Sequence, residues 1–252
     1  MTYEFSLVIF TVLGQLAAGL SLLIWLAGPQ TNERLAWLFV LVAGLLGIAG
    51  GITHLHDAAS VPYMILGLPH SWLSLETLAG AVFGLLVLLR VLNVLKAGQN
   101  FLPGIFGVIF VLVTSQVYFR NSLVPLWSNW GVILAFAAAM FAMGGAASLV
   151  FNQEPGGRKI ALAAFIIGAV FAGVGPVFWL GALDNLDAQL IRRFCQAAIC
   201  LGLTQMVALA VGGALLAVSP KRIPACIALI LALAGIAAGR ALFYAANIKL
   251  GI

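Results

Sequence analysis

The chain has 252 residues, of which 63% are hydrophobic and only 8% carry a charge. A soluble domain has about 25% charged residues, so this chain is too apolar to cover a water-facing surface. The composition therefore excludes a soluble enzyme, a disordered segment and, in spite of a formal net charge of +5, a nucleic-acid-binding module.

Long apolar stretches, separated by short segments with charges, proline and glycine, predict eight membrane-spanning helices. Each stretch is long enough to cross a hydrocarbon core, which takes about 20 helical residues. We therefore expect an all-α polytopic membrane protein. Residues 1–252 should form a helix bundle that is a single transmembrane domain. The order of the spans is compatible with two halves of four helices. The spans lie near 5–27, 35–55, 72–95, 103–121, 126–151, 158–181, 191–217 and 224–246.

Several residues inside or beside the spans predict packing rather than chemistry. Glycines such as Gly19 and Gly144 let helices approach closely in lipid, and Gln15 favours an interhelical hydrogen bond. Pro176 predicts a kink in the sixth span, and Arg90, alone at its end of the third span, is expected to snorkel to the interface. Four aromatic residues are expected in an interfacial belt: Tyr3, Trp72, Trp127 and Trp130. Three cysteines are expected to be buried and inert: Cys195, Cys200 and Cys226.

The distribution of Lys and Arg predicts the orientation, because cytoplasmic loops carry an excess of both. The loops after odd-numbered spans hold Arg34, Arg90, Lys96, Arg158, Lys159, Lys221 and Arg222. The opposite side holds only Arg120, Arg192, Arg193 and Lys249. The odd loops are therefore expected in the cytoplasm, which places both termini on the outer, periplasmic side.

Polar and ionisable residues of several spans fall near this outer face. Such residues are costly inside a membrane and commonly functional. The sequence therefore predicts a helix bundle with one polar site near the outer interface. The residues concerned are His54, Glu76, Gln116, Tyr118, Arg120, Arg240 and Tyr244.

A histidine, a carboxylate and a tyrosine at one membrane face suit a quinol, which has two hydroxyls to deprotonate and an apolar tail. His54 and Glu76 are the candidate proton acceptors. We expect no haem, because all three histidines fall at one end of the bundle. We also expect no metal site, because His54 and His56 point to different helix faces. The chain is too short for an electron-carrying domain of its own, so the electron acceptor would be a partner protein.

Five short segments form a recognisable series along the chain. The first is Leu-Val-Ile-Phe-Thr-Val-Leu-Gly-Gln at 7–15, and the second is His-Leu at 54–55. The third is Ser-Trp-Leu-Ser-Leu-Glu at 71–76. Val-Tyr at 117–118 with Val-Pro-Leu-Trp at 124–127, and Gly-Arg-Ala-Leu-Phe-Tyr at 239–244, complete the series.

In this order the segments resemble the membrane anchor subunit of dimethyl sulfoxide reductase and its relatives, over nearly the whole chain. Three positions depart from the pattern of that family. His56 stands where a glycine commonly follows His-Leu, Leu75 replaces an asparagine, and Gln116 replaces an arginine before Val-Tyr.

The resemblance implies a haem-free anchor of the bacterial inner membrane that serves anaerobic respiration. It implies menaquinol oxidation near the periplasmic face, with His54 and Glu76 as the reactive residues and Tyr118 as a further candidate. Because they lie at the same face, we expect Gln116, Arg240 and Tyr244 to complete the binding site. It also implies two partners, a ferredoxin-like iron–sulfur subunit and a molybdopterin catalytic subunit. These subunits would hold the clusters and the molybdopterin, and substrate reduction would take place in the catalytic subunit.

Two other functions are compatible with the same sequence. A purely structural anchor would hold its partners without a quinone site. A small-molecule transporter would place polar groups at midspan on broken helices, whereas the polar groups here are expected near one face.

Overall fold

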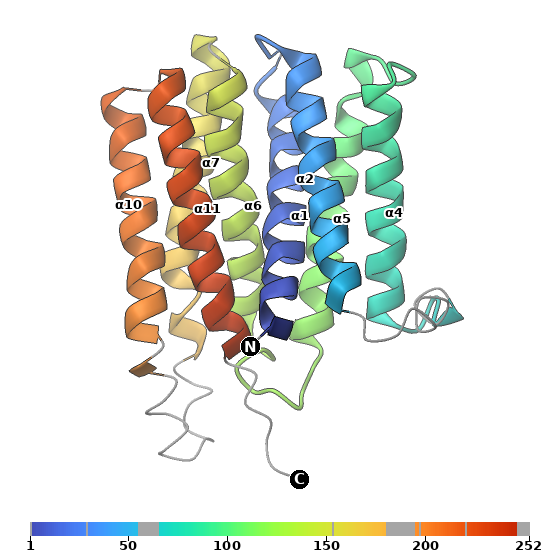
Figure 1. Cartoon of the computed structure of the whole chain (residues 1–252), viewed down its shortest axis with the longest axis vertical. Helices are drawn as coiled ribbons and strands as arrows, with labels where there is room; N and C mark the ends of the chain where they lie inside the picture. Colours follow the sequence, from blue (N-terminus) through green and yellow to red (C-terminus); the bar gives the residue numbers. More distant parts are fainter. Residues whose placement is uncertain are drawn as a thin grey trace.

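A computed structural model of the chain describes residues 2–28, 30–54, 66–152, 154–179, 195–196, 198–219 and 221–245, and the side chains of these residues except 2–4 and 54. Eight of its helical segments are long and apolar enough to cross a membrane, which confirms the prediction of an all-helical, multi-pass chain. The elements, shown in Figure 1, are α1 (Thr2–Leu26), α2 (Glu33–His54), α4 (Trp72–Val91), η2 (Ala97–Gln99), α5 (Phe101–Phe119), α6 (Trp130–Phe151), α7 (Pro155–Val174), η3 (Ala198–Gly202), α10 (Leu203–Val218) and α11 (Arg222–Ala245).

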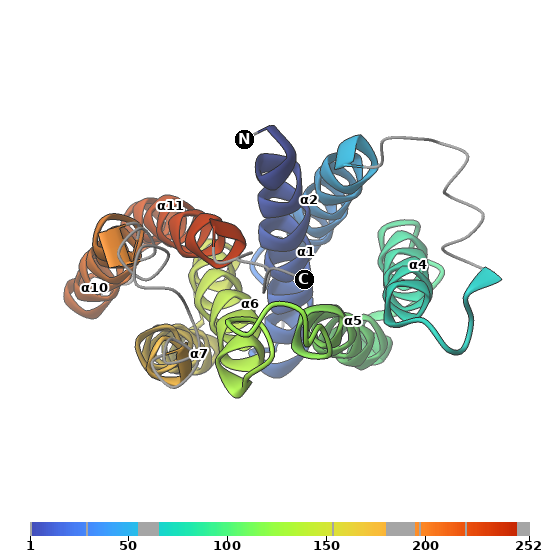
Figure 2. The same cartoon turned by 90° about the horizontal axis from the view of Figure 1, so that it is seen from below.

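The helices form two halves of four, as the sequence order allows. α1, α2, α4 and α5 pack together in one half, and α6, α7, α10 and α11 pack together in the other. Figure 2 shows the two groups side by side, joined mainly where α1 lies against α6. α1 and α6 are also the most buried spans. In their most apolar stretches 78% and 72% of the residues are buried, against 22–44% in the other six spans.

Two glycines allow the central helices to touch through their backbones. A Cβ atom added to Gly19 would overlap the carbonyl oxygen of Met140 and lie 3.0 Å from the Cα atom of Gly144. A Cβ atom added to Gly144 would come within 2.7 Å of the Cα atom of Gly19. The predicted close approach through small residues is therefore confirmed at the α1–α6 contact, where the two halves meet.

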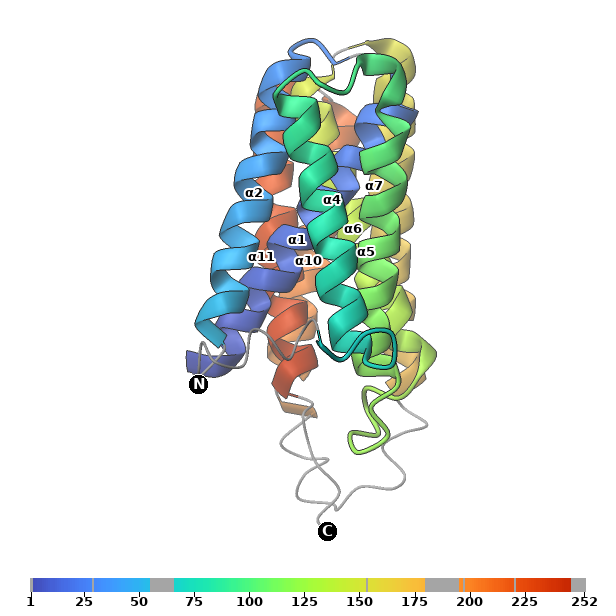
Figure 3. The same cartoon turned by 90° about the vertical axis from the view of Figure 1, so that its right-hand side faces the viewer.

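A second buried contact lies at the end of the bundle where α2 begins and α4 ends (Figure 3). The guanidinium of Arg90 donates to the Glu33 carboxylate over 2.7 Å and to the Asn100 side chain over 2.7 Å. Asn100 also donates to Glu33 over 2.8 Å, and Trp37 lies beside Arg90. The expectation that Arg90 snorkels is wrong, because Glu33 and Asn100 supply partners that hold the guanidinium inside the chain.

The third span is shorter than predicted, since α4 ends at Val91 and Asn93 adopts a left-handed backbone with φ 59°. The irregularity expected at Pro176 is present, because α7 ends at Val174 and a turn at 175–176 precedes a further short helical stretch at 177–179. These breaks set the ends of the helices, while the spans themselves lie close to the predicted ranges.

Two expectations from residue type are wrong. Trp127 is not in an interfacial belt but 7% exposed and hydrogen-bonded inside the chain, whereas Trp72 and Trp130 are exposed, as expected. The thiols are not buried: Cys195 and Cys200 are exposed on the surface of the chain and Cys226 is half-buried. An apolar run in a membrane protein faces lipid as readily as the protein core, so its apolar character does not predict burial.

Candidate functional site

The predicted polar site lies at the end of the bundle where α1 and α4 begin and α5 and α11 end (Figure 1). Helices from both halves contribute to it. Four of the five motif segments found in the sequence supply side chains there: 7–15, 71–76, 117–127 and 239–244. Segments that are far apart in the chain therefore meet at the junction between the two halves.

Two tyrosines form the centre of this cluster. The hydroxyl oxygens of Tyr118 on α5 and Tyr244 on α11 lie 2.9 Å apart, and either can donate. The Tyr244 hydroxyl also donates to Thr11 of α1 over 3.5 Å. Both rings are buried, at 9% and 2% exposed, so the hydroxyls form a chain that joins three helices.

A buried arginine lies on the α11 side of the tyrosines. Arg240 is only 3% exposed and donates through Nη2 to the side-chain oxygen of Gln15 over 2.9 Å. Its guanidinium carbon also lies 3.9 Å from the centre of the Phe136 ring, within the range of a cation–π interaction. The interhelical hydrogen bond predicted for Gln15 is thus confirmed, with a charged partner on the last helix.

The arginine is not fully paired within the described part of the chain. Its Nε and Nη1 atoms, together with Nε2 of Gln15, are buried without a hydrogen-bond partner among the described residues. An unsatisfied buried donor commonly indicates bound water or a ligand. The guanidinium can therefore donate a hydrogen bond to an oxygen atom that does not belong to the described residues.

The local structure of residues 66–76 places Glu76 inside the bundle. Ser71 caps α4 by accepting a hydrogen bond from the backbone nitrogen of Ser74 over 3.4 Å, and its own backbone nitrogen donates to Gly67 over 2.9 Å. Glu76 follows in the second turn and is 7% exposed. Its side chain faces Thr114 of α5, and its charge lies within electrostatic range of Tyr118.

One carboxylate oxygen of Glu76 has no hydrogen-bond partner among the residues described, and the same holds for the hydroxyls of Thr114 and Ser74. A buried carboxylate without a partner is costly, so it is protonated, hydrated or bound to another group. This is the property required of a group that takes up and releases a proton.

The segment between α5 and α6 covers this end of the cluster. Trp127 donates from its indole nitrogen to the backbone oxygen of Phe243 over 2.8 Å, and the two rings are stacked with centres 5.4 Å apart. Tyr118 packs edge-on against both rings. Val124 and Leu126 of the same segment are 1% and 0% exposed, so the connection is packed against the bundle.

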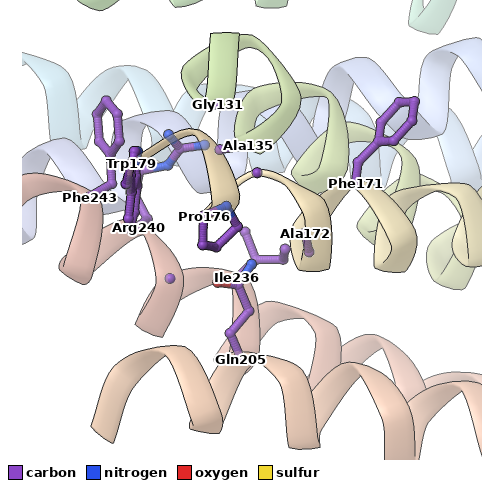
Figure 4. Close-up of a pocket in the computed structure, with 12 residues that line it drawn as sticks. Gly131, Ala135, Phe171, Ala172, Pro176, Trp179, Gln205, Ile236, Arg240 and Phe243 are labelled. Carbon is purple, nitrogen blue, oxygen red and sulfur yellow. The ribbon is translucent and has the colours of Figure 1, made fainter. Parts of the chain in front are cut away.

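A pocket opens beside Arg240 between α6, α7, α10 and α11, as shown in Figure 4. The cavity is small, about 30 Å³, and is not fully enclosed. Its walls are apolar except for Arg240, Gln205 and the Trp179 indole, and they include Ala135, Phe171, Ala172, Pro176, Ile236 and Phe243. The pocket therefore has room for about two water molecules beside the Arg240 guanidinium.

The structure brings together four of the predicted site residues, Glu76, Tyr118, Arg240 and Tyr244. Gln116 lies on a different face of α5, where its side chain accepts a hydrogen bond from Arg120 over 3.4 Å. His54 is the last residue of α2, at the same end of the bundle as Glu76, but its side chain lies outside the described residues.

Other residues of the cluster were not predicted from the sequence. Thr11 and Gln15 stand four apart, a spacing that places them on one face of α1. That signal could have linked Thr11 to the site. Phe136, Thr114 and Gln205 gave no such signal, because an aromatic residue or a single polar side chain in an apolar helix commonly serves packing.

Comparison with known families and proteins gives the following result. The family model described as "DMSO reductase anchor subunit (DmsC)" matches residues 1–246, which is nearly the entire chain. A search of curated proteins found no match. The match covers all eight spans and every segment of the buried polar cluster.

Proposed function

Because the chain belongs to the family of DMSO reductase anchor subunits (DmsC), we propose that it anchors a molybdoenzyme complex in the bacterial inner membrane and oxidises menaquinol for it. The proposed partners are an iron–sulfur subunit and a molybdopterin catalytic subunit that reduces the terminal acceptor. The clusters and the molybdopterin belong to these partners, and the anchor contains no haem. Family membership supports the anchor role, whereas quinol oxidation rests on the chemistry of the buried cluster.

The observation that supports a quinol site best is the position of Glu76. Its carboxylate is buried near one end of the bundle and has an oxygen without a partner among the described residues. The Tyr118–Tyr244 pair and Arg240 lie in the same cluster. A proton acceptor, hydroxyl groups and a cation thus lie together in one cluster, which is the set of groups that oxidation of a quinol needs.

We assign the following roles to the residues of the chain. Oxidation of one quinol to quinone releases two electrons and two protons. His54 and Glu76 accept the protons and pass them to the outer aqueous side, while Tyr118, Arg240 and Tyr244 bind or orient the headgroup. The electrons leave one at a time to an iron–sulfur cluster of the partner subunit, which is the oxidant, and the isoprenoid tail stays in the bilayer.

The test uses the complex purified through a tag on this chain in mild detergent. We expect iron, molybdenum and two further polypeptides to co-purify, and we expect the complex to oxidise a reduced naphthoquinol. Glu76→Gln should lower the rate of oxidation per molybdenum by about 100-fold or more, the size of a lost proton acceptor. Gly44→Ala is the control, because a Cβ atom at Gly44 would meet nothing within 4 Å.

Two outcomes would contradict the proposal in different ways. A metal-containing complex that neither binds nor oxidises quinol would show a purely structural anchor. A chain that purifies alone and without metal would instead favour a transporter. Normal turnover in Glu76→Gln would remove Glu76 from the reaction while leaving the anchor role intact.

A further inference from the structure

A larger pocket lies at the opposite end of the bundle from the tyrosine pair, where α2 begins and α4 ends. It measures about 220 Å³ and is not fully enclosed, whereas the cavity beside Arg240 measures about 30 Å³. It therefore has room for a phosphate group together with part of a glycerol. The residues that line it come from the start of α2 and the end of α4: Glu33, Arg34, Trp37, Arg90, Val91 and Asn93.

The pocket lies at the level where the surface of the membrane is expected. Glu33 is the first residue of one apolar span, and Arg90 is the last but one residue of another. At this level a bilayer presents its polar headgroups rather than its hydrocarbon chains. The distribution of Lys and Arg in the sequence also predicts that this end of the bundle faces the cytoplasm, so the pocket is open to lipid headgroups and to cytoplasmic solutes.

Arg90 is a buried wall of the pocket that is not fully paired. Its side chain is 9% exposed, Nη2 donates to Glu33 and Nε donates to Asn100. The third nitrogen, Nη1, has no hydrogen-bond partner among the described residues, and it is not one of the atoms that the chain closes off completely. Because Arg90 lines the pocket, Nη1 can donate to a charged oxygen atom there.

Arg34 supplies a second cation at the same pocket. Its side chain is exposed and makes no hydrogen bond within the described part of the chain. Two arginines and one glutamate line the pocket, so the lining has a net charge of +1. Nearby, the Lys96 ammonium donates to the backbone oxygen of Asn93 over 3.0 Å and adds positive charge beside the wall. The pocket therefore favours an anion.

The carboxylate of Glu33 does not exclude an anion, because donors of the chain already offset its charge. Trp37, Arg90 and Asn100 all donate to one of its oxygens, Oε1, over 3.4, 2.7 and 2.8 Å. The other oxygen, Oε2, accepts no hydrogen bond from the described residues and is not fully buried. An anion that also carries a hydroxyl group can donate to Oε2 while its charge faces the arginines.

A stripe of exposed apolar side chains continues from the pocket along α2. Leu38 and Leu45 follow Arg34 by four and eleven residues, spacings that place all three residues on one side of the helix. The two leucines are 37% and 56% exposed. A hydrocarbon chain that lies along this stripe reaches the headgroup level at Arg34, next to the pocket.

We propose that this pocket binds the headgroup of an anionic phospholipid, with the phosphate between Arg34 and Nη1 of Arg90. Arginine suits the charged oxygens of a phosphodiester, and basic pockets between transmembrane helices are common sites for anionic headgroups. The hydroxyl groups of phosphatidylglycerol suit Oε2 of Glu33, and an acyl chain lies along Leu38 and Leu45. The bound lipid stabilises the contact between the start of α2 and the end of α4. Inorganic phosphate offers the same charge without an acyl chain and is the competing ligand.

The experiment measures lipid binding to the tagged chain, purified in mild detergent with its partners and depleted of lipid. Titrations followed by native mass spectrometry give the Kd of phosphatidylglycerol, of phosphatidylethanolamine and of inorganic phosphate. We expect phosphatidylglycerol to bind most tightly and to raise the melting temperature. Equally tight binding of phosphatidylethanolamine, or the same stabilisation by inorganic phosphate, would overturn the proposal.

Two variants test whether the pocket itself binds the lipid. Arg34→Gln should raise the Kd of phosphatidylglycerol by about fivefold or more, the effect of one arginine at an anionic surface. The variant should fold normally, because Arg34 is exposed and has no hydrogen bond to lose within the described residues. Arg222→Gln is the matched control, since Arg222 is an exposed arginine that begins α11 at the same end of the bundle and does not line the pocket. An equal loss in both variants would show unspecific attraction and overturn the proposal.

A photoreactive lipid determines the location of the site. Phosphatidylglycerol with a diazirine on its headgroup should label peptides that contain residues 33–37 or 90–93, and excess unlabelled phosphatidylglycerol should suppress this label. Label found only elsewhere in the chain would overturn the proposal. None of these measurements uses quinol oxidation, and the pocket shares no residue with the proposed quinol site, so either proposal can fail while the other stands.

Discussion

The hydroxyl oxygens of Tyr118 and Tyr244 lie 2.9 Å apart although the residues are 126 positions apart in the sequence. The bond joins the last turn of α5, in the first half of the chain, to the last turn of α11, in the second half. Because both rings are buried, the Tyr118 hydroxyl depends on Tyr244 for hydrogen bonding, and the Tyr244 hydroxyl depends on Tyr118 and Thr11. The pair therefore holds the two halves together at the end of the bundle where the polar cluster lies.

Replacing either tyrosine by phenylalanine should weaken this end of the bundle. Tyr118→Phe leaves the Tyr244 hydroxyl with only a 3.5 Å contact to Thr11, which we expect to cost about 1–3 kcal/mol of stability. Heating the purified complex in detergent while following helical circular dichroism measures the loss. Both single variants should also oxidise quinol more slowly, because the proposed site contains both hydroxyls.

The double variant Tyr118→Phe/Tyr244→Phe distinguishes a coupled pair from two independent residues. Residues in contact commonly show non-additive effects. We expect the double variant to cost clearly less stability than the sum of the two single variants. Strict additivity would mean that the 2.9 Å contact contributes nothing to stability.

The contact between Gly19 and Gly144 predicts a sharp size limit at the centre of the bundle. Gly144→Ala places a methyl group against the backbone of α1, with no flexible side chain that could move away. Overpacking of this kind costs about 1–3 kcal/mol, so the melting temperature of the purified complex should fall. Gly84→Ala is the matched control, because its Cβ atom would meet nothing within 4 Å, and an equal loss there would contradict the explanation.

The sequence predicted the number of spans, their approximate ranges and the end of the bundle at which polar residues gather. It succeeded because the cost of placing polar groups in lipid gives a signal that depends on residue type alone. The motif residues Glu76, Tyr118, Arg240 and Tyr244 were identified in the same way. Their mutual contacts could not be predicted, since these depend on which helices pack together.

Arg90 and Trp127 show where residue type misleads. Both types prefer the interface when they are unpaired, and the sequence shows no partner near either. Arg90 finds Glu33, which is 57 positions away, and Trp127 finds the backbone of Phe243, which is 116 positions away. A buried polar partner at long range changes the preferred position of a side chain, and only the tertiary structure shows that partner.

The Glu33–Arg90 pair predicts a stability effect without an effect on the reaction. Arg90→Met removes a charged hydrogen bond of 2.7 Å, which is commonly worth about 1.5–3 kcal/mol. Because the Glu33 side chain is 26% exposed, we expect the lower part of this range. The melting temperature should fall while quinol oxidation per molybdenum stays normal, since the pair lies at the opposite end of the bundle from Glu76.

The double variant Glu33→Met/Arg90→Met tests whether the loss of stability comes from a buried charge that is left without its partner. Removing both charges should cost less than the sum of the two single variants, because neither charge is left alone. A double variant that loses the full sum would mean that the two side chains act separately, with Asn100 and Trp37 as their main partners.

The orientation predicted from Lys and Arg can be tested at two exposed positions at opposite ends of the bundle. Ser128 lies at the end that holds the polar cluster, and Gly98 lies in η2 near Glu33 and Arg90. If the cluster faces outward, a cysteine at Ser128 should react with a membrane-impermeant maleimide in intact cells. A cysteine at Gly98 should react only after the cells are opened.

The background for this experiment is a variant in which the native thiols are replaced by alanine, since two of them are exposed: Cys195, Cys200 and Cys226. Labelling of both positions in opened cells shows that each engineered thiol is reactive. The opposite pattern in intact cells would place the polar cluster on the cytoplasmic side. Quinol protons would then be released inside the cell, so the experiment also determines whether oxidation at this site contributes to the proton gradient.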